Sequence, residues 1–287
     1  RPNSSVTSPL RCAICTQRAL HVQFVAPIEL DYHNAIGIPE AARIKAAEEA
    51  LDFDNARIVG GAAAGLGAYP FLGGLVITLT TGGTSVCGST LLSNTRAVTA
   101  AHCWRSGNTQ ARQFTVVLGS TLLFSGGTRV STSDVEMHAN YNDNTLVNDI
   151  AIIRLGWVTY NNNVRNIAIA TGSNLFVGTW AWAAGFGRTS DSAGISNNQF
   201  LSHVQVQVIT NAVCQSTYGS TTVQTSTLCV ATTGGRGTCG GDSGGPLVAN
   251  NQLIGVTSFG HILGCQRNFP AGFARVTAFA SWIQARL

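Results

Sequence analysis

The stretch Gly241-Asp242-Ser243-Gly244-Gly245-Pro246-Leu247 restricts the fold more than any other part of the chain. A serine among glycines can be a plain turn residue, but the aspartate before it and the Gly-Gly-Pro run after it argue against that interpretation. Gly241 can adopt backbone conformations that a side chain would resist. The loop can therefore present backbone N–H groups beside Ser243, whose hydroxyl becomes a candidate functional group.

Two further patterns upstream supply a histidine and an aspartate. Thr99-Ala100-Ala101-His102-Cys103 places a histidine directly before a cysteine. Asn148-Asp149-Ile150-Ala151-Ile152-Ile153 places an aspartate at the start of an apolar run. A lone histidine is usually structural, and a lone aspartate before a strand is usually a turn residue. The order His, Asp, Ser along one chain favours a different interpretation of both.

Hydrolytic acyl transfer needs a nucleophile, a base that takes its proton, and an acid that orients the base. Ser243 is the candidate nucleophile, His102 the base and Asp149 the acid. A buried Asp149 would fix the tautomer of His102 and stabilise the imidazolium as it forms. The backbone N–H groups of Gly241 and Ser243 would point at the developing oxyanion.

The sequence changes character near residue 58. Residues 39–51 predict a short amphipathic helix, because Pro39 suits its first turn and Ile44, Ala47 and Leu51 recur at helical spacing. Beyond Arg57, short β-rich runs recur between Gly, Asn, Ser and Thr, at residues 75–79, 114–118, 150–155, 204–209 and 253–258. A helical face returns only at residues 276–287. The pattern predicts an all-β body over residues 58–287 that ends in one helix.

Composition excludes several classes of protein. Among 287 residues, 17 are Lys or Arg and 13 are Asp or Glu, so charged residues make up only 10%, against about 25% in an average chain. Hydrophobic residues reach 45%, which allows a large core. The net charge of +4 is spread without basic runs and gives no nucleic-acid footprint. No apolar stretch is long enough for a transmembrane helix.

The positive charge is almost all arginine. The only lysine is Lys45, so residues 58–287 carry 11 Arg, no Lys and 6 acidic residues. Lysine loses its charge near pH 10.4, whereas arginine stays charged beyond about pH 12. A lysine-free body fits an enzyme in strongly alkaline fluid, and compositional drift is the alternative explanation.

Eight cysteines, an even number with scattered spacing, indicate disulfides and a secreted protein. Cys12-Ala13-Ile14-Cys15 is a lone Cys-x-x-Cys without a second pair or a nearby histidine, so zinc is not expected there. A redox role would need a βαβ context, which the sequence lacks. We therefore expect no metal and no cofactor.

Residues 58–287 resemble the chymotrypsin-like serine peptidases (trypsin/chymotrypsin family, S1). The resemblance rests on Ile58-Val59-Gly60-Gly61, on the three patterns described above and on Ser258-Phe259-Gly260. Within the family, the chain is similar to insect (lepidopteran) midgut chymotrypsins through Ile38-Pro39, Asn211-Ala212-Val213-Cys214 and Gly237-Thr238-Cys239. The family fold implies two antiparallel six-stranded Greek-key β-barrels, at about residues 58–165 and 166–287, with a C-terminal α-helix. Residues 1–57 would be a leader or activation peptide.

The resemblance also implies a zymogen. Cleavage after Arg57 by a trypsin-like peptidase would free the α-amine of Ile58, which would pair with the buried carboxylate of Asp242. The alternative is that Arg57-Ile58 is an ordinary exposed junction. The family pattern further implies three disulfides, namely Cys87–Cys103, Cys214–Cys229 and Cys239–Cys265. Cys12 and Cys15 then have no partner in the body, so the activation peptide would leave after cleavage.

Substrate specificity follows from the same resemblance. Gly237 matches the base of the S1 pocket, Ser258-Phe259-Gly260 one wall, and Ala271 the far side. The pocket then has no carboxylate for Lys or Arg and suits large apolar or aromatic P1 residues. Gly237 is also similar to crustacean collagenolytic peptidases, but those carry an acidic residue where this chain has Ala271. The loop of residues 119–130 has no carboxylate, so the trypsin-type calcium site is not expected.

These observations predict a secreted digestive endopeptidase that works through an acyl-enzyme. Its partners would be protein or peptide substrates, an activating trypsin-like peptidase and proteinaceous inhibitors, and we expect a monomer that binds neither nucleic acid nor membrane. One alternative is a broad-specificity collagenolytic peptidase. Another is a catalytically inactive adaptor, although such chains usually lose the His, the Asp or the Ser. A cascade peptidase would usually carry a larger N-terminal interaction domain.

Overall fold

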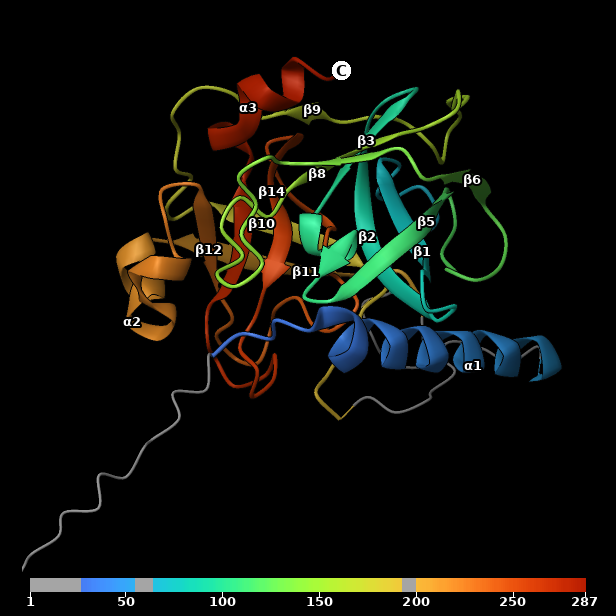
Figure 1. Ribbon diagram of the computed structural model, residues 1–287, viewed down its shortest axis with the longest axis horizontal. Coiled ribbons are helices and arrows are strands. Elements are labelled where there is room, and N and C mark those ends of the chain that lie inside the picture. Colours follow the sequence, from blue (N-terminus) through green and yellow to red (C-terminus); the bar gives the residue numbers. More distant parts are fainter. Residues whose placement is uncertain (1–26, 55–63, 193–199) are drawn as a thin grey trace, which may run out of the picture.

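The computed structural model describes residues 27–54, 64–192 and 200–287. Two β-sheets lie next to each other, a long helix crosses one end of the molecule, and a short helix at the C-terminus lies at the opposite end (Figure 1). Neither Arg57 nor Ile58 falls within the described residues. Within these ranges, no helix is long and apolar enough to cross a membrane.

The first sheet has eight strands in the order β4-β5-β1-β2-β3-β8-β7, with β6 also paired to β5. All of its pairings are antiparallel. The strands are β1 (Leu72–Leu79), β2 (Thr84–Ser93), β3 (Arg96–Thr99), β4 (Arg105–Ser106), β5 (Thr109–Leu118), β6 (Thr128–Thr132), β7 (Val135–Met137) and β8 (Ala151–Arg154).

The second sheet has seven strands in the order β13-β10-β11-β12-β15-β14-β9. Because β13 pairs with both β10 and β14, six of these strands close into a ring. The two-residue β9 is added outside that ring by the one parallel pairing among the described strands. The strands are β9 (Ala168–Ile169), β10 (Trp180–Gly185), β11 (Ser202–Ile209), β12 (Thr227–Ala231), β13 (Pro246–Ala249), β14 (Gln252–Phe259) and β15 (Ala271–Arg275).

The predicted fold class is confirmed. The sheets have eight and seven strands rather than six each, and the strands beyond six include the two-residue β4 and β9. Alternation of apolar and polar residues decides which face of a strand is buried. On β11, Val206 and Val208 are buried while Gln205 is exposed. The first core forms around Leu75, Ile77 and other apolar residues of β1, β5 and β8.

Three α-helices flank the sheets. Helix α1 (Ile38–Asp54) follows a π-helical turn at His33–Gly37, and it is slightly longer than the predicted 39–51. Helix α3 (Val276–Gln284) lies where the C-terminal helix was expected. Helix α2 (Asn211–Thr222) was not expected, and the Thr210 hydroxyl caps it by accepting from the Val213 N–H. Helix α1 crosses the ends of β1 and β2 at the edge of the first sheet (Figure 1).

Candidate active site

His102 and Asp149 form the centre of a buried hydrogen-bond network. His102 lies in a 3₁₀ turn, Ala101–Cys103, directly after β3, and Asp149 lies two residues before β8. The two strands pair, so the side chains meet. The Asp149 carboxylate accepts from the backbone N–H of His102 at 2.9 Å and contacts the ring Nδ1 at 2.7 Å. Both side chains are almost fully buried.

The Asp149 carboxylate accepts a third hydrogen bond. The Ser258 hydroxyl, at the end of β14, donates to Asp149 Oδ2 at 2.6 Å. Sequence analysis placed Ser258 only in the wall of the substrate pocket, and nothing local in the sequence links it to Asp149. With Nδ1 held by the carboxylate, the His102 ring presents Nε2 as its remaining nitrogen, and Nε2 has no hydrogen-bond partner among the described residues. The arrangement therefore leaves a fixed imidazole nitrogen that can take a proton.

Ser243 is buried in a loop that approaches β2 very closely. Its carbonyl accepts from the Gly88 N–H at 2.6 Å. Gly244 has φ +79°, and a Cβ there would collide with the Gly88 carbonyl and the Thr99 hydroxyl. Gly241 has φ +100°, and a Cβ there would lie 2.9 Å from the Gly187 Cα. Glycine is thus required at both positions, and this explains the glycine-dense run around the serine.

The Asp242 carboxylate lies between its own loop and the residues that follow β10. It accepts from the N–H groups of Gly187 and Cys239, both at 2.9 Å. Burial raises the pKa of Asp242 to about 6 against the effect of these hydrogen bonds, and nearby Glu40 raises it further. A cavity of about 320 Å³ lies beside the carboxylate. The predicted partner, the α-amine of Ile58, lies outside the described residues.

The predicted substrate-pocket residues separate into two groups. Ser258, Phe259 and Gly260 line a cavity of about 290 Å³ that also contacts His102 and Ser243. A Cβ on Gly260 would meet no atom within 4 Å, so this wall is open. Gly237 lines the cavity beside Asp242 instead.

Two of the predicted pocket residues are buried. Ala271 is buried in the second core with 3% exposure. The Phe259 ring is also buried and lies against Gly272, where an added Cβ would collide with it. Ala271 therefore lies behind the lining of the pocket, whereas Phe259 is buried and still contacts the cavity.

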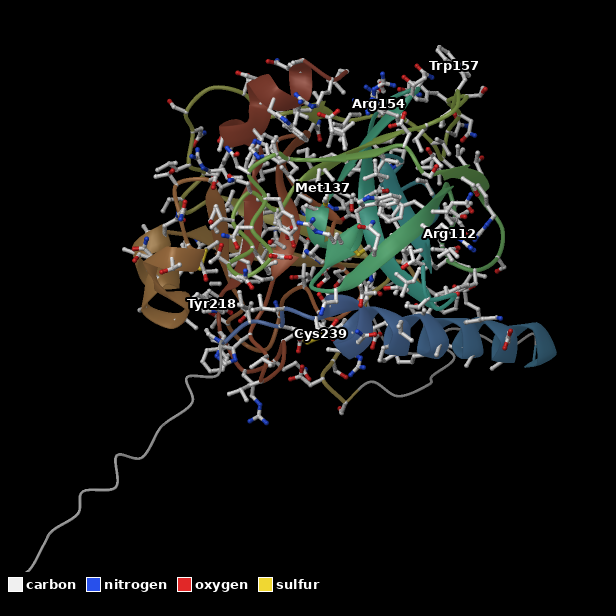
Figure 2. The ribbon with its side chains drawn as sticks, viewed as in Figure 1. Arg112, Met137, Arg154, Trp157, Tyr218 and Cys239 are labelled. Carbon is white, nitrogen blue, oxygen red and sulfur yellow. A yellow bond between two sulfur atoms is a disulfide. The ribbon has the colours of Figure 1, made fainter. Side chains whose placement is uncertain are left out.

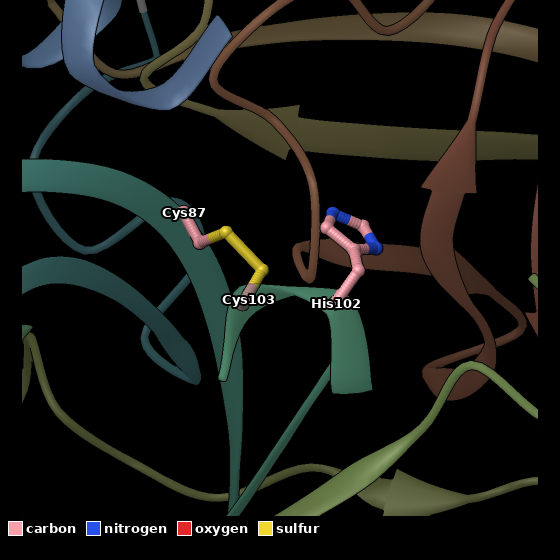
Figure 3. Close-up of side chains that lie close together, drawn as sticks. All are labelled: Cys87, His102 and Cys103. Carbon is pink, nitrogen blue, oxygen red and sulfur yellow. A yellow bond between two sulfur atoms is a disulfide. The ribbon is translucent and has the colours of Figure 1, made fainter. Parts of the chain in front are cut away.

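The three disulfides in the structure join the pairs that the family resemblance implies, Cys87–Cys103, Cys214–Cys229 and Cys239–Cys265. Figure 3 shows the first of them next to His102. The sulfurs of Cys87 and Cys103 are bonded to each other, so they offer no thiolates to a metal beside the histidine. The same holds for Cys239 and Cys265 beside Asp191.

Residues from the N-terminal segment occupy the site, and none of them was predicted from the sequence. The Tyr32 ring, from the segment before α1, lies with its centroid 4.7 Å from that of His102. Its hydroxyl donates to the Val86 carbonyl at 2.8 Å. Segment residues Tyr32, Ile36 and Glu40 also line the 290 Å³ cavity. No local pattern marks Tyr32, because its position depends on contacts with strands more than 50 residues away.

The chain is similar to a known protein family, to relatives in that family and to a solved structure. The chain matches the protein-family model described as Trypsin over residues 58–283. It is 35% identical over 239 residues to a protein named Collagenase from Hypoderma lineatum, covering 82% of this chain and 88% of that protein. It is 38% identical over 232 residues to Trypsin delta from Drosophila melanogaster, covering 80% and 88%. A solved structure of HL collagenase superposes with a TM-score of 0.73 at 35% identity, covering 80% of this chain and 98% of that one.

Proposed function

Because the chain belongs to the trypsin family of serine proteases, we propose that it is a secreted endopeptidase that cleaves through a Ser243 acyl-enzyme. The observation that carries the proposal is the buried network of His102, Asp149 and Ser258 beside the Ser243 loop. A carboxylate that receives three donors holds one imidazole tautomer, which is what a general base next to a serine requires.

In the proposed reaction, the Ser243 Oγ attacks the carbonyl carbon of the scissile peptide bond, and its proton passes to His102 Nε2. The backbone N–H groups of Gly241 and Ser243 stabilise the oxyanion, each contributing about 3 kcal/mol in comparable sites. The tetrahedral intermediate then collapses as the leaving amine takes the proton from His102. A water molecule attacks the resulting ester by the same route in reverse and releases the second product.

Zymogen activation belongs to the same proposal. Cleavage after Arg57 would release the Ile58 α-amine, which would enter the cavity beside Asp242. Burial raises the pKa of that carboxyl to about 6, so an incoming ammonium would stabilise its charged form. The cavity of about 320 Å³ leaves room for an isoleucine side chain.

The proposed P1 preference is for large apolar or aromatic side chains. Gly237 and Ala271 carry no charge, and the Asp191 carboxylate, which also lines the 290 Å³ cavity, accepts from the N–H groups of Cys265 and Gln266. No described body residue therefore places a free carboxylate at the base of the pocket. A lysine or arginine P1 group would lose its hydration there without a partner.

A second candidate is a broad-specificity collagenolytic activity. It is favoured by the relatives, since one is named Collagenase and another, Brachyurin from Leptuca pugilator, is 40% identical over 205 residues. The neutral Ala271 disfavours it, because the collagenolytic peptidases that the sequence resembles carry an acidic residue there. Comparison of native collagen with denatured collagen as substrates separates the two candidates.

We place the protein outside the cell, in a digestive lumen, with an activating trypsin-like peptidase and proteinaceous inhibitors as partners. Three disulfides and relatives such as Trypsin, alkaline C from Manduca sexta support this placement. Secretion from midgut cells, followed by N-terminal sequencing of the active protein, tests it. The expected sequence begins Ile-Val-Gly-Gly.

The central experiment treats the full chain with trypsin and titrates it with an ester that acylates the active serine. We expect burst release only after cleavage at Arg57 and none from Ser243→Ala. The values of kcat/KM on Phe, Tyr, Leu and Arg substrates then test the pocket. Absence of a burst from the cleaved chain at every dilution would leave only a binding role, and a strong preference for Arg would overturn the pocket assignment.

A further inference from the structure

The segment before α1 follows the cleft from one side to the other. On one side, the Pro27 carbonyl accepts from the Ile262 N–H at 2.9 Å, just beyond the Ser258-Phe259-Gly260 wall. In the middle, the Ser106 hydroxyl donates to the Leu30 carbonyl at 2.9 Å and accepts from the Tyr32 N–H at 3.0 Å. The backbone of the segment is therefore fixed by the body on both sides of Leu30.

Tyr32 occupies the place where a scissile bond would have to lie. Its side chain is 5% exposed, and its ring lies against His102. Burial raises the pKa of its phenol, and hydrogen bonding to the Ser243 side chain and the Gly241 backbone opposes that rise. Tyr32, His102 and Ser243 all line the same cavity, so the Tyr32 side chain lies beside the candidate nucleophile and the candidate base. A substrate carbonyl and Tyr32 cannot both occupy this position.

Farther along the cleft, Glu40 fixes the start of α1 to Arg188 in the loop after β10, and the Arg188 N–H in turn donates to the Gly240 carbonyl of the loop that precedes the nucleophile. Its fully buried carboxylate pairs with Arg43 Nε at 2.8 Å and closely with Arg188 Nε. A Cβ on Gly240 would lie 3.1 Å from the Ile36 side chain, so that loop also packs against the segment. Figure 2 shows the neighbouring Cys239 beside the start of α1.

A separate contact fixes the middle of α1. The buried Glu48 carboxylate accepts from the N–H groups of Leu123 and Phe124, at 2.6 and 2.9 Å. Ala41 and Ile44 of the same helix are buried in a cluster with Leu123 and other residues of the first barrel. These contacts lie far from Ser243, so they contribute to docking without touching the catalytic groups.

From these contacts we propose that residues 27–54 are a built-in inhibitor that stays in the cleft after the bond at Arg57 is cut. The inference rests on the proposed function. None of the described contacts of the segment depends on the Arg57–Ile58 bond, so cleavage leaves all of them in place. Activation then has two steps: the cut that frees Ile58, and release of the segment. The segment docks on the cleft and, through α1, on the adjoining surface of the first barrel around Leu123.

The test uses the full chain cleaved by trypsin, with completeness of the cut at Arg57 checked by N-terminal sequencing. Hydrolysis of a small ester is measured over a thousandfold range of dilution. We expect activity per mole of cleaved chain to rise on dilution, and the segment to elute with the body in gel filtration at high concentration. Constant specific activity and separate elution would overturn the proposal.

Variants of the segment test the docking whatever the affinity of the wild-type segment for the cleft. Glu48→Gln replaces two charge-assisted hydrogen bonds and should weaken docking about tenfold or more, moving the dilution curve to higher concentration. Glu49→Gln, on the exposed side of the same helix, is the matched control and should leave the curve unchanged. Coincident curves for Glu48→Gln and Glu49→Gln would contradict the docking geometry.

Failure of the proposed function gives a different result. A Tyr32→Ala/Glu48→Gln chain, cleaved in the same way, loses contacts at both ends of the inhibitor and should show a full burst with the acylating ester. No burst from this variant at any dilution would mean that the body is not a peptidase. A burst equal to that of the undiluted, cleaved wild type would mean that it is a peptidase without a built-in inhibitor.

Discussion

Acid should release the inhibitor segment through His33. This side chain is fully buried, and its Nδ1 lies 2.9 Å from the Ser85 hydroxyl of β2. Its Nε2 has no hydrogen-bond partner in the described part of the chain. Burial lowers the pKa of His33 to about 4; nearby His102 lowers it further, and Asp31 opposes that. Protonation would bury a cation with an unpaired N–H group.

The direction and size of the pH effect on docking follow from the difference between the pKa of His33 in the docked form and in the released form. A released His33 has its ordinary pKa of about 6.5, so docking is strongest above that pH and weakens as the pH falls toward 4. At pH 5, about 97% of the released form and only about 10% of the docked form would be protonated. Docking should therefore be about 30-fold weaker at pH 5 than at pH 7.5, which corresponds to about 2 kcal/mol.

Hydrogen exchange of the α1 amides in the uncut chain measures this equilibrium, after correction for the intrinsic dependence of exchange on pH. The control is His33→Asn, whose amide can still pair with Ser85 but does not titrate. Burial raises the pKa of Glu48, which makes its own contribution run the opposite way. The diagnostic quantity is thus the difference between wild type and His33→Asn. If the two chains lose protection in parallel between pH 7.5 and pH 5, the reasoning about His33 is wrong.

Three further predictions concern the body. Ser258→Ala removes one of three donors from Asp149, so steady-state kinetics should show kcat lowered about tenfold with KM unchanged. Asp242→Asn should leave cleavage at Arg57 intact on gels but lower activity by about 100-fold or more, because the Ile58 amine then has no charged partner. Gly237 faces the cavity beside Asp242 in the uncut chain, so Gly237→Asp tests whether it forms the base of the substrate pocket after cleavage at Arg57; kcat/KM should then shift toward Arg and Lys substrates. The substitution should also lower Tm, because its Cβ would lie 2.8 Å from the Thr232 methyl group.

Much of the fold could be predicted because alternation and helical spacing are local. The predicted helix over 39–51 is α1, and residues 204–209 are part of β11. Helix α2 was missed because Asn211–Thr222 is rich in Ser and Thr, with little apolar spacing, and is interrupted at Gly219, where φ is +75°. Its formation depends on the Thr210 cap and on the Cys214–Cys229 disulfide.

The site could be predicted only where residues form a recognisable local pattern. His102, Asp149 and Ser243 stand in such patterns, and the structure brings the first two together. The bond from Ser258 to Asp149 spans 109 residues and leaves no mark on either neighbourhood. Tyr32 is likewise positioned by tertiary contacts alone. Sequence analysis treated residues 1–57 as a segment to be discarded, and this obscured their contacts with the cleft.

Three consecutive residues of β2 each hold a different part of the site. Val86 accepts from Tyr32, Cys87 is bonded to the neighbour of His102, and Gly88 donates to the carbonyl of Ser243. Three consecutive residues of one strand thus position the inhibitor segment, the base and the nucleophile. A shift of that strand would displace all three together, so a change in its packing should alter both catalysis and inhibition. A substitution that changes catalysis alone or inhibition alone would therefore have to lie in the groups that contact this strand, not in the strand itself.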